Sequence, residues 1–335
     1  MTSIRPRPAT ITDIARQAGV STATVSYALN DAPGSRIPES TRSRVRAAAD
    51  ELGYVPHSSA RSLRTGTSDV VLYVQLENVR GQLAADFTHE LTLGVRELGY
   101  TFMQYGAEPH RGVKAARNWA RLRPAAVIAG IDRLTPAGVE LMRKAGIRVL
   151  AAGGTSAAAK ELGVSRLAMD HRGVGRVAAE HLLGRGHQDI AAVVPTLDPL
   201  RQMGNERLAG LRETAEAAGA RVSPFEMDWS PESATALVAR WRQEGMPESV
   251  FGYNDEFSGL LLGALLDAGV RVPEEVGLVG TDDVMLCRML RPQLSSVRMD
   301  RGDVSDMARC IVDVIRGGPQ ADFSPWTPTM VERQT

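Results

Sequence analysis

The 335-residue sequence contains few of the features that mark secreted, disulfide-bonded or membrane proteins. Its two cysteines, Cys287 and Cys310, both lie in apolar helical surroundings, which indicates reduced, buried thiols and argues against a disulfide. No apolar run reaches the length of a membrane span, and the first ten residues, MTSIRPRPAT, contain no signal-peptide core. These absences predict a cytoplasmic protein.

Motifs of catalysis are also absent. The sequence has no G-x-S-x-G elbow and no phosphate-binding Walker loop, and GVGRVA at 173–178 follows a helix start, which argues against a dinucleotide fingerprint. No two histidines have the spacing that would place them with a carboxylate on one helix face, so no metal site is expected from His57, His89, His110, His171, His181 and His187. We therefore expect no cofactor, and an enzyme is only a remote alternative.

The formal net charge of zero hides an asymmetry along the chain. Residues 1–66 hold nine arginines and no lysine against five acidic residues, a balance of +4, so the remainder carries −4. A basic segment on a mildly acidic body fits a protein that contacts phosphate through one domain, although an ordinary basic tail has the same balance. The length fits two or three domains. Residues 1–9, with Pro6 and Pro8, are expected to form a disordered extension.

Residues 10–55 have the apolar spacing of a small all-helical domain. The apolar residues of ITDIARQA (11–18) recur every three or four positions, which predicts a helix opened by Thr10 and ended by Gly19. Ser21 is the expected N-cap of a second short helix, and residues 39–52 should form a third. Two short helices joined by so tight a turn are a helix-turn-helix, with a plain helical hairpin as the alternative.

The second helix would be the recognition helix of this motif. Only the N-terminal residues and one face of such a helix reach base edges in the major groove, which makes Thr22, Ala23 and Tyr27 the expected base-reading residues. Small polar groups around them suit phosphate oxygens, and the expected phosphate contacts are Ser21, Thr24, Ser26, Asn30 and Arg42. For the arginines of the third helix, a solvated face is the alternative.

Several longer segments occur in a fixed order along the chain: TITDIARQAGVSTATVSYALN, STRSRVRAAADELGYVPHSSARSLRTG, GHQDIAAV, RLAGLRETAEAAG, YNDEFSGLLLGALLDAGVRVPEEVGLVGTDD and LSSV. In these segments the chain resembles the lactose-repressor/galactose-repressor family of transcription factors. The resemblance implies a sequence-specific DNA-binding regulator, a repressor, that acts as a homodimer on a pseudo-palindromic operator. It also implies that a small-molecule effector controls operator affinity.

The resemblance further implies a hinge helix within residues 56–68 that lies in the minor groove of the operator. Leu63 would wedge into the central base step, although a core position under the linker is the alternative. The hinge contacts would come from His57, Ser58, Ala60, Arg61, Leu63 and Arg64. Two departures prevent transfer of an operator sequence: Tyr27 replaces the family's usual arginine, which pairs with guanine, and His57 replaces the usual asparagine.

From residue 69 onward, short apolar runs alternate with amphipathic helical stretches. Strands are expected at 70–76, 100–105, 125–130, 147–153, 189–195, 221–227, 249–254 and 276–281. Helices are expected at 83–98, 113–121, 136–145, 172–184, 205–218, 232–243 and 256–268. The alternation predicts parallel sheets with helices on both faces, in two doubly wound subdomains. The expected fold class is therefore an all-α helix-turn-helix headpiece followed by an α/β core.

The resemblance implies a periplasmic-binding-protein type I fold for the core at 69–335, with three crossings between subdomains. We expect crossings near 165–170, 296–300 and 324–328, with residues 301–323 helical. Subdomain one would hold about 69–166 and 299–326, and subdomain two about 167–298 and 327–335. The tail from 317 contains three prolines and no heptads, which predicts a dimer without an added helical bundle.

Ligands of paired α/β subdomains bind beyond the carboxyl ends of the strands, where polar residues follow several predicted strands. Together with positions taken from the resemblance, the candidate effector-binding residues are Glu77, Asn78, Arg80, Asp170, Arg207, Trp229, Asn254, Asp255 and Asp282. Helix capping is the favoured role for Asp170 and an equal alternative for Asp255. A surface-loop aromatic is the alternative for Trp229.

Departures from the family pattern concern the effector. The first loop reads NVRGQ where the family has an apolar-aromatic pair after Asn-Pro, and LAAGGTS at 150–156 lacks an acid that often binds sugar hydroxyls. The missing acid argues against a simple sugar, whereas Arg80 and Arg207 favour a phosphorylated sugar or another anion. A regulator that has lost effector control and a solute-binding protein for a transporter remain the alternatives.

Overall fold

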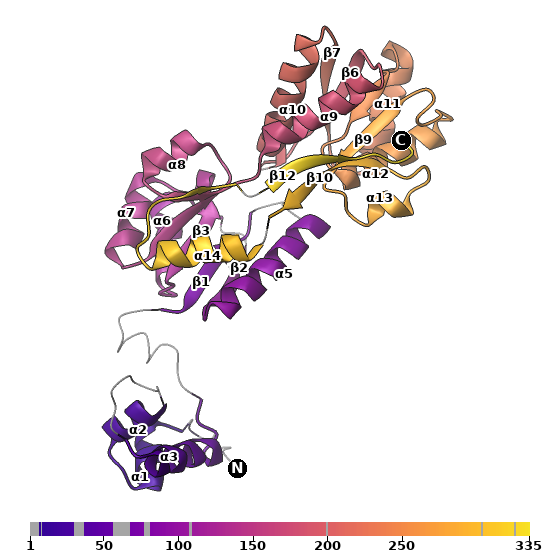
Figure 1. Cartoon of the computed structure of the whole chain (residues 1–335). Coiled ribbons are helices and arrows are strands. Elements are labelled where there is room, and N and C mark those ends of the chain that lie inside the picture. Colours follow the sequence, from indigo (N-terminus) through magenta and orange to yellow (C-terminus); the bar gives the residue numbers. More distant parts are fainter. Residues whose placement is uncertain are drawn as a thin grey trace, which may run out of the picture. The chain divides into compact units, whose positions relative to one another are not determined.

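The computed structural model (Figure 1) describes residues 7, 9–29, 37–55, 68–76, 81–106, 109–198, 200–302, 304–324 and 326–335. The chain divides into two compact units, Met1–Ser68 and Asp69–Thr335. No helix in the described ranges is both long and apolar enough to cross a membrane. Cys287 is buried and Cys310 is partly buried, and neither forms a disulfide.

The described part of the first unit folds into α1 (Ile11–Ala18), α2 (Thr22–Leu29) and α3 (Glu39–Glu51). A capping box opens α1, because the backbone N–H of Asp13 donates to the Thr10 hydroxyl and that of Thr10 donates to the Asp13 carboxylate. Gly19 ends α1 with φ 66°, a left-handed conformation that glycine adopts without strain. The buried hydrophobic residues that the structure describes in this unit are isoleucine, valine and alanine, and larger residues such as Leu52 and Tyr54 pack against them partly buried.

The second unit contains two six-stranded sheets, which we call sheets A and B. Sheet A has the order β11-β5-β4-β3-β1-β2 and is formed by β1 (Val70–Val74), β2 (Thr101–Tyr105), β3 (Ala126–Gly130), β4 (Arg148–Ala152), β5 (Ser165–Leu167) and β11 (Asp322–Phe323). Sheet B has the order β12-β10-β9-β8-β6-β7 and is formed by β6 (Asp189–Pro195), β7 (Arg221–Met227), β8 (Ser249–Phe251), β9 (Gly277–Thr281), β10 (Ser295–Arg301) and β12 (Trp326–Val331).

Helices connect the parallel strands within each sheet (Figure 1). Subdomain one, around sheet A, contains α5 (Gln82–Glu97), α6 (Gly112–Ala120), α7 (Pro136–Lys144), α8 (Ser156–Leu162), α14 (Val304–Ile315) and a short 3₁₀ turn at Ile131–Arg133. Subdomain two, around sheet B, contains α9 (His171–Gly184), α10 (Leu200–Ala217), α11 (Pro231–Glu244), α12 (Asp255–Asp267) and α13 (Leu286–Met289). The predicted fold class, a helical headpiece with two doubly wound α/β subdomains, is confirmed.

Strand pairing places the first two chain crossings slightly later than the sequence boundaries at 166 and 298, and the third slightly earlier than the boundary at 326. Leu167 still pairs with Phe323 in sheet A, whereas Arg301 pairs with Trp326 in sheet B. Residues 299–301 and Trp326 therefore belong to subdomain two. The stretch 301–323 is not wholly helical, because α14 ends at Ile315 and β11 then adds to the edge of sheet A. An ion pair of 2.8 Å between Arg166 and Asp322 fixes that edge.

Candidate functional site

Helix α2 exposes the three residues that the sequence predicts to read bases. The side chain of Tyr27 is 52% exposed, and Thr22 and Ala23 are exposed at the start of the helix. Val25 and Ala28 lie on the opposite face and are buried in the core of the first unit. The packing of α2 therefore leaves its Thr22–Tyr27 face available for a base edge.

Two of the predicted phosphate contacts already take part in a helix cap. The Ser21 hydroxyl accepts the N–H of Thr24 at 3.1 Å and is 2.9 Å from the Thr24 hydroxyl, so Ser21 caps α2. Arg42 joins two helices, because its guanidinium lies 3.5 Å from the Ala28 carbonyl and 3.6 Å from the Glu39 carboxylate. Asn30, with the hinge residues His57, Ser58, Ala60, Arg61, Leu63 and Arg64, lies outside the described residues.

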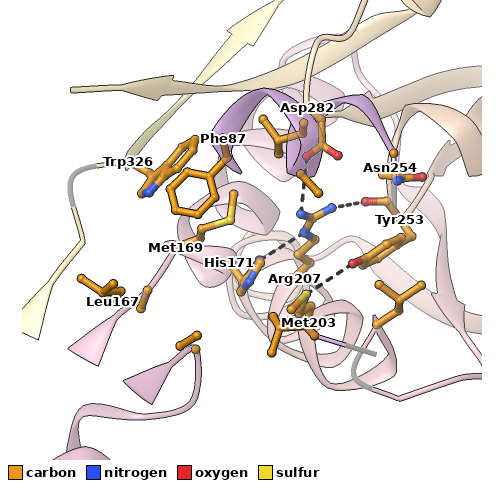
Figure 2. A pocket seen from close by; sticks show the side chains of 18 of the residues that line it. Phe87, Leu167, Met169, His171, Met203, Arg207, Tyr253, Asn254, Asp282 and Trp326 are labelled. Atoms are coloured by element: carbon orange, nitrogen blue, oxygen red, sulfur yellow. Dashed lines mark hydrogen bonds and ion pairs between the residues drawn. The ribbon is translucent and has the colours of Figure 1, made fainter. Parts of the chain in front are cut away.

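A cavity of about 190 Å³ lies between the two subdomains of the core (Figure 2). Of the predicted effector-binding residues, Arg207, Trp229, Asn254 and Asp282 line it. Glu77, Asn78 and Arg80 lie outside the described residues, so their predicted role is untested. The lining also includes His171, Tyr253, Glu256, Phe87, Met169 and Trp326, which the sequence did not single out. Sequence periodicity alone does not separate them from ordinary core or helix residues.

Arg207 organises the polar end of the cavity (Figure 2). Its side chain is only 4% exposed, and its guanidinium donates to the carbonyl of Tyr253 and, at 3.4 Å, to Nδ1 of His171. Nη2 of Arg207 lies 3.6 Å from Oδ1 of Asp282, and the guanidinium carbon lies 4.6 Å from the centre of the Tyr253 ring. The buried positive charge is therefore compensated on several sides.

Burial sets the protonation of this cluster. Desolvation raises the pKa of the Asp282 carboxyl to about 8, although the Arg207 charge pulls it down. Desolvation, with a smaller effect of Arg207, lowers the pKa of His171 to about 3, so that its imidazole is neutral and Nδ1 can accept a hydrogen bond. Among the described lining residues Arg207 is the one cation, and Asp282 already faces it. The described cavity thus holds a single cation, whose guanidinium already donates to the carbonyl of Tyr253 and to His171.

Two glycines hold Arg207 in place by letting α9 and α10 touch. A Cβ atom on Gly175 would lie 1.9 Å from the carbonyl oxygen of Arg207, and one on Gly210 would lie 2.0 Å from the carbonyl oxygen of Arg172. Only glycine fits so close a contact between backbones. In the sequence, GVGRVA at 173–178 was weighed only as a nucleotide-binding motif, which left this packing role unpredicted. The small residues repeated in both helices were the available signal.

Asp170 and Asp255 do not line the cavity, which corrects two of the predicted contacts. Asp170 caps α9 by accepting the N–H of Gly173 at 2.8 Å, the role that the sequence favoured. Asp255 is fully buried behind the cavity wall, where it accepts the Ser296 hydroxyl at 2.7 Å and the N–H of Val284 at 2.9 Å. Asn254, not Asp255, caps α12. The carboxylate of Asp255 is thus used to hold the loop after β9.

Comparisons with known proteins cover both units. Residues 10–57 match the family described as "Bacterial regulatory proteins, lacI family", and residues 179–335 match "Periplasmic binding protein-like domain". The chain is 31% identical over 326 residues to the HTH-type transcriptional regulator CelR of Thermobifida fusca, covering 93% of this chain and 94% of the relative. It is 30% identical over 343 residues to GalR of Salmonella typhimurium, covering 98% and 96%.

Solved structures show the same architecture. A "transcriptional regulator CelR-cellobiose complex" is 26% identical, with a TM-score of 0.66 over 98% of this chain and 99% of the other. A lac repressor dimer bound to operator and the anti-inducer ONPF has a TM-score of 0.79 at 22% identity, over 98% and 99%, which shows the fold alone. The curated relatives are transcriptional regulators and not enzymes. The chain belongs to the lacI family of bacterial regulatory proteins and is a DNA-binding transcriptional regulator of the helix-turn-helix type.

Proposed function

We propose that this regulator is a repressor whose operator affinity is set by a small molecule bound in the cavity between the two subdomains. The buried cluster of Arg207, Asp282 and His171 at the cavity wall carries this proposal. Taking a guanidinium charge and polar groups of this kind out of water costs free energy, and apolar residues of similar size would stabilise the core at least as well. A cluster that is costly and faces a cavity is explained by ligand recognition.

Ligand control follows from the way in which both subdomains line the cavity. Leu83 and Phe87 come from subdomain one, and Arg207 and Asn254 come from subdomain two. A molecule that contacts both walls binds one closure state more tightly than the other and shifts the population toward it. By linkage, operator DNA then changes the affinity for that molecule by the same factor.

The operator is bound by a homodimer in this proposal, with one headpiece on each half of a pseudo-palindromic site. Thr22, Ala23 and Tyr27 read bases, and Ser21, Thr24, Ser26, Asn30 and Arg42 contact phosphates. The segment 57–64 acts as the hinge helix, and Leu63 enters the minor groove. The resemblance supports this arrangement, and the lac repressor in the comparison is a dimer bound to operator. The protein would act in the cytoplasm, where it meets the DNA.

A neutral saccharide is the effector class that we favour over an anion. The guanidinium of the single cation in the described lining is already hydrogen-bonded to Tyr253 and His171, and the CelR relative forms a complex with cellobiose. Arg207 and Asp282 together offer a donor and an acceptor, which is the pairing that a sugar hydroxyl uses.

The test uses the full-length protein and an operator selected from random duplex DNA. The operator dissociation constant is measured with and without cellobiose and a set of neutral sugars and glycosides. At least one of them should change the constant about tenfold or more. Asp282→Asn should keep operator affinity without ligand and lose the response, whereas Glu274→Gln, an exposed charge change far from the cavity lining, should keep both.

Three results would count against the proposal. Failure to select any specific DNA site would refute regulation through a sequence-specific operator. If the ligand changes the operator affinity of Asp282→Asn as much as that of the unmodified protein, the cavity is not the effector site. An operator affinity that no compound of the set changes would favour the effector-independent regulator.

A further inference from the structure

We propose that helix α2 reads thymine methyl groups in the major groove, and that the ring of Tyr27 selects a thymine at its own position in each half-site. This inference rests on the part of the proposed function that places α2 in the groove, and it names the bases that the helix prefers. It follows from the chemistry of the exposed face of α2 and from the contacts of the arginines in the same unit.

The exposed face of α2 holds no charged side chain and no amide. From 22 to 29 the sequence is TATVSYAL, and its exposed residues are Thr22, Ala23 and Tyr27. Guanine is read in the major groove by arginine or lysine, and adenine by asparagine or glutamine, because these side chains bond to two groove atoms of one base. Helix α2 therefore lacks the side chains that make paired hydrogen bonds to a purine.

The exposed residues of α2 share apolar groups instead. Thr22 and Ala23 each carry a methyl group, and Tyr27, which is 52% exposed, carries an aromatic ring. Thymine is the base whose major-groove edge carries a methyl group, and contact of that methyl with such side chains removes apolar surface from water. A cytosine in its place would press a polar amino group against the same carbon atoms and leave that donor without a partner.

The described arginines of the first unit are occupied by other contacts. The guanidinium of Arg42 lies 3.5 Å from the carbonyl of Ala28, and its side chain is only 15% exposed. Arg44 donates to the carbonyl of Ala18 at 2.9 Å. Arg16, in α1, lies 3.8 Å from the Asp13 carboxylate. None of these arginines lies on α2, so base reading by this helix is left to its neutral side chains.

The test starts from a binding-site selection with the full-length protein and random duplex DNA. Each thymine of the selected site is then replaced in turn by deoxyuridine, which differs only in the missing C5 methyl group. Because this methyl projects into the major groove, the replacement leaves minor-groove contacts of the hinge unchanged. At positions read by α2, each replacement should raise the dissociation constant about fourfold, as the loss of one buried methyl predicts. Replacing the whole A·T pair by G·C should raise it about tenfold.

Variants of Tyr27 assign the contact, and its exposed position leaves the core of the unit intact. Tyr27→Phe keeps the ring and should keep the thymine preference. In Tyr27→Ala the deoxyuridine effect should vanish at one position of each half-site, which is the coupling expected of a direct contact. Tyr27→Arg should change the selected base at that position to guanine. Ala47→Ser, a neutral change at an exposed position of α3, should keep the selected site and every deoxyuridine effect.

Three results would overturn the inference while a specific site, and with it the proposed function, stands. They are a guanine selected by the unmodified protein at the Tyr27 position, deoxyuridine that binds as tightly as thymine there, and loss of the thymine preference in Tyr27→Phe. The last would assign the reading to the hydroxyl. A selected sequence that no substitution of Thr22, Ala23 or Tyr27 alters would refute the proposed base-reading residues together with the inference.

Discussion

Subdomains one and two have the same strand order, but subdomain two buries charged residues and subdomain one is mainly apolar. The order β5-β4-β3-β1-β2 corresponds position by position to β10-β9-β8-β6-β7. The edge strands already differ, because β11 is two residues long and parallel to its neighbour, whereas β12 is six residues long and antiparallel. The common backbone arrangement therefore does not constrain which residues stand at the strand ends, and those residues determine what the cavity binds.

Buried charge is the clearest contrast between the two. Subdomain two buries Arg207, Asp255 and an ion pair between Arg333 and Asp283, whose side chains are 9% and 3% exposed. Among the described residues of subdomain one, Ser165 is the one buried polar residue. Subdomain two thus holds its loops by compensated charges, and subdomain one relies on apolar packing.

The largest expected effect tests whether the two scaffolds are equally stable. Trp119 in α6 and Trp241 in α11 occupy corresponding helices and are both fully buried. Trp119→Ala and Trp241→Ala should each lower the free energy of unfolding by about 3–5 kcal/mol, because each leaves a large cavity. Urea denaturation followed by circular dichroism measures this. Trp229→Ala, at an exposed position, should change the free energy of unfolding by less than about 0.5 kcal/mol. A large difference between Trp119→Ala and Trp241→Ala would show that the two subdomain scaffolds are not equally stable.

A smaller effect tests the support of the polar end of the cavity. Gly175→Ala forces a Cβ atom into the carbonyl of Arg207, and it should cost about 2–3 kcal/mol and displace the Arg207 side chain. Gly184→Ala lies in the same helix, where an added Cβ meets nothing within 4 Å, and it should be neutral or stabilising by up to about 1 kcal/mol. Thermal unfolding and ligand titration compare the two. Equal stability of both variants would show that the contact between helices is relaxed in solution.

The smallest effect uses pH to isolate one residue at the polar end of the cavity. The pKa of His171 is lowered from 6.5 to about 3, so between these values the unfolded chain binds a proton that the folded chain does not. The free energy of unfolding therefore falls as pH falls below 6.5, by about 2 kcal/mol near pH 5. His171→Gln should lack this part of the pH dependence, whereas His89→Gln should keep it. Denaturation midpoints measured at several pH values compare the unmodified protein with the two variants. If stability depends on pH identically in all three proteins, the lowered pKa of His171 is refuted.

The sequence predicted the large elements because their periodicity is local. The capping residue Thr10, the breaker Gly19 and the alternation of apolar strands with helices are all readable within a few residues. Strands β5, β10, β11 and β12 were not predicted. Strands β5 and β11, of three and two residues, are too short to show a period, and β10 and β12 lie where the sequence indicated only crossings between the subdomains. Two of the three crossings fall within the predicted windows 165–170 and 324–328, and the second lies just beyond 300 because Arg301 still pairs in sheet B.

Two of the residues that line the cavity, Asn254 and Asp282, were predicted because a polar residue follows directly on a strand. Arg207, within a helix, was predicted from the family resemblance. Asp255 was misassigned, because which of two adjacent polar residues faces the cavity depends on the backbone of a single turn. Phe87 and His171 could not be distinguished from ordinary helix residues, since their role requires the two subdomains to face each other.

The four tryptophans fall into two pairs that should respond differently in fluorescence when a ligand binds. Trp119 and Trp241 are sealed in helices away from the cavity lining, whereas Trp229, 58% exposed, and Trp326, packed on Phe87, both border the cavity. A ligand that fills the cavity changes the surroundings of the second pair and leaves the first pair constant. The intrinsic near-ultraviolet emission of the unlabelled protein therefore contains both a reporter of occupancy and its own internal reference.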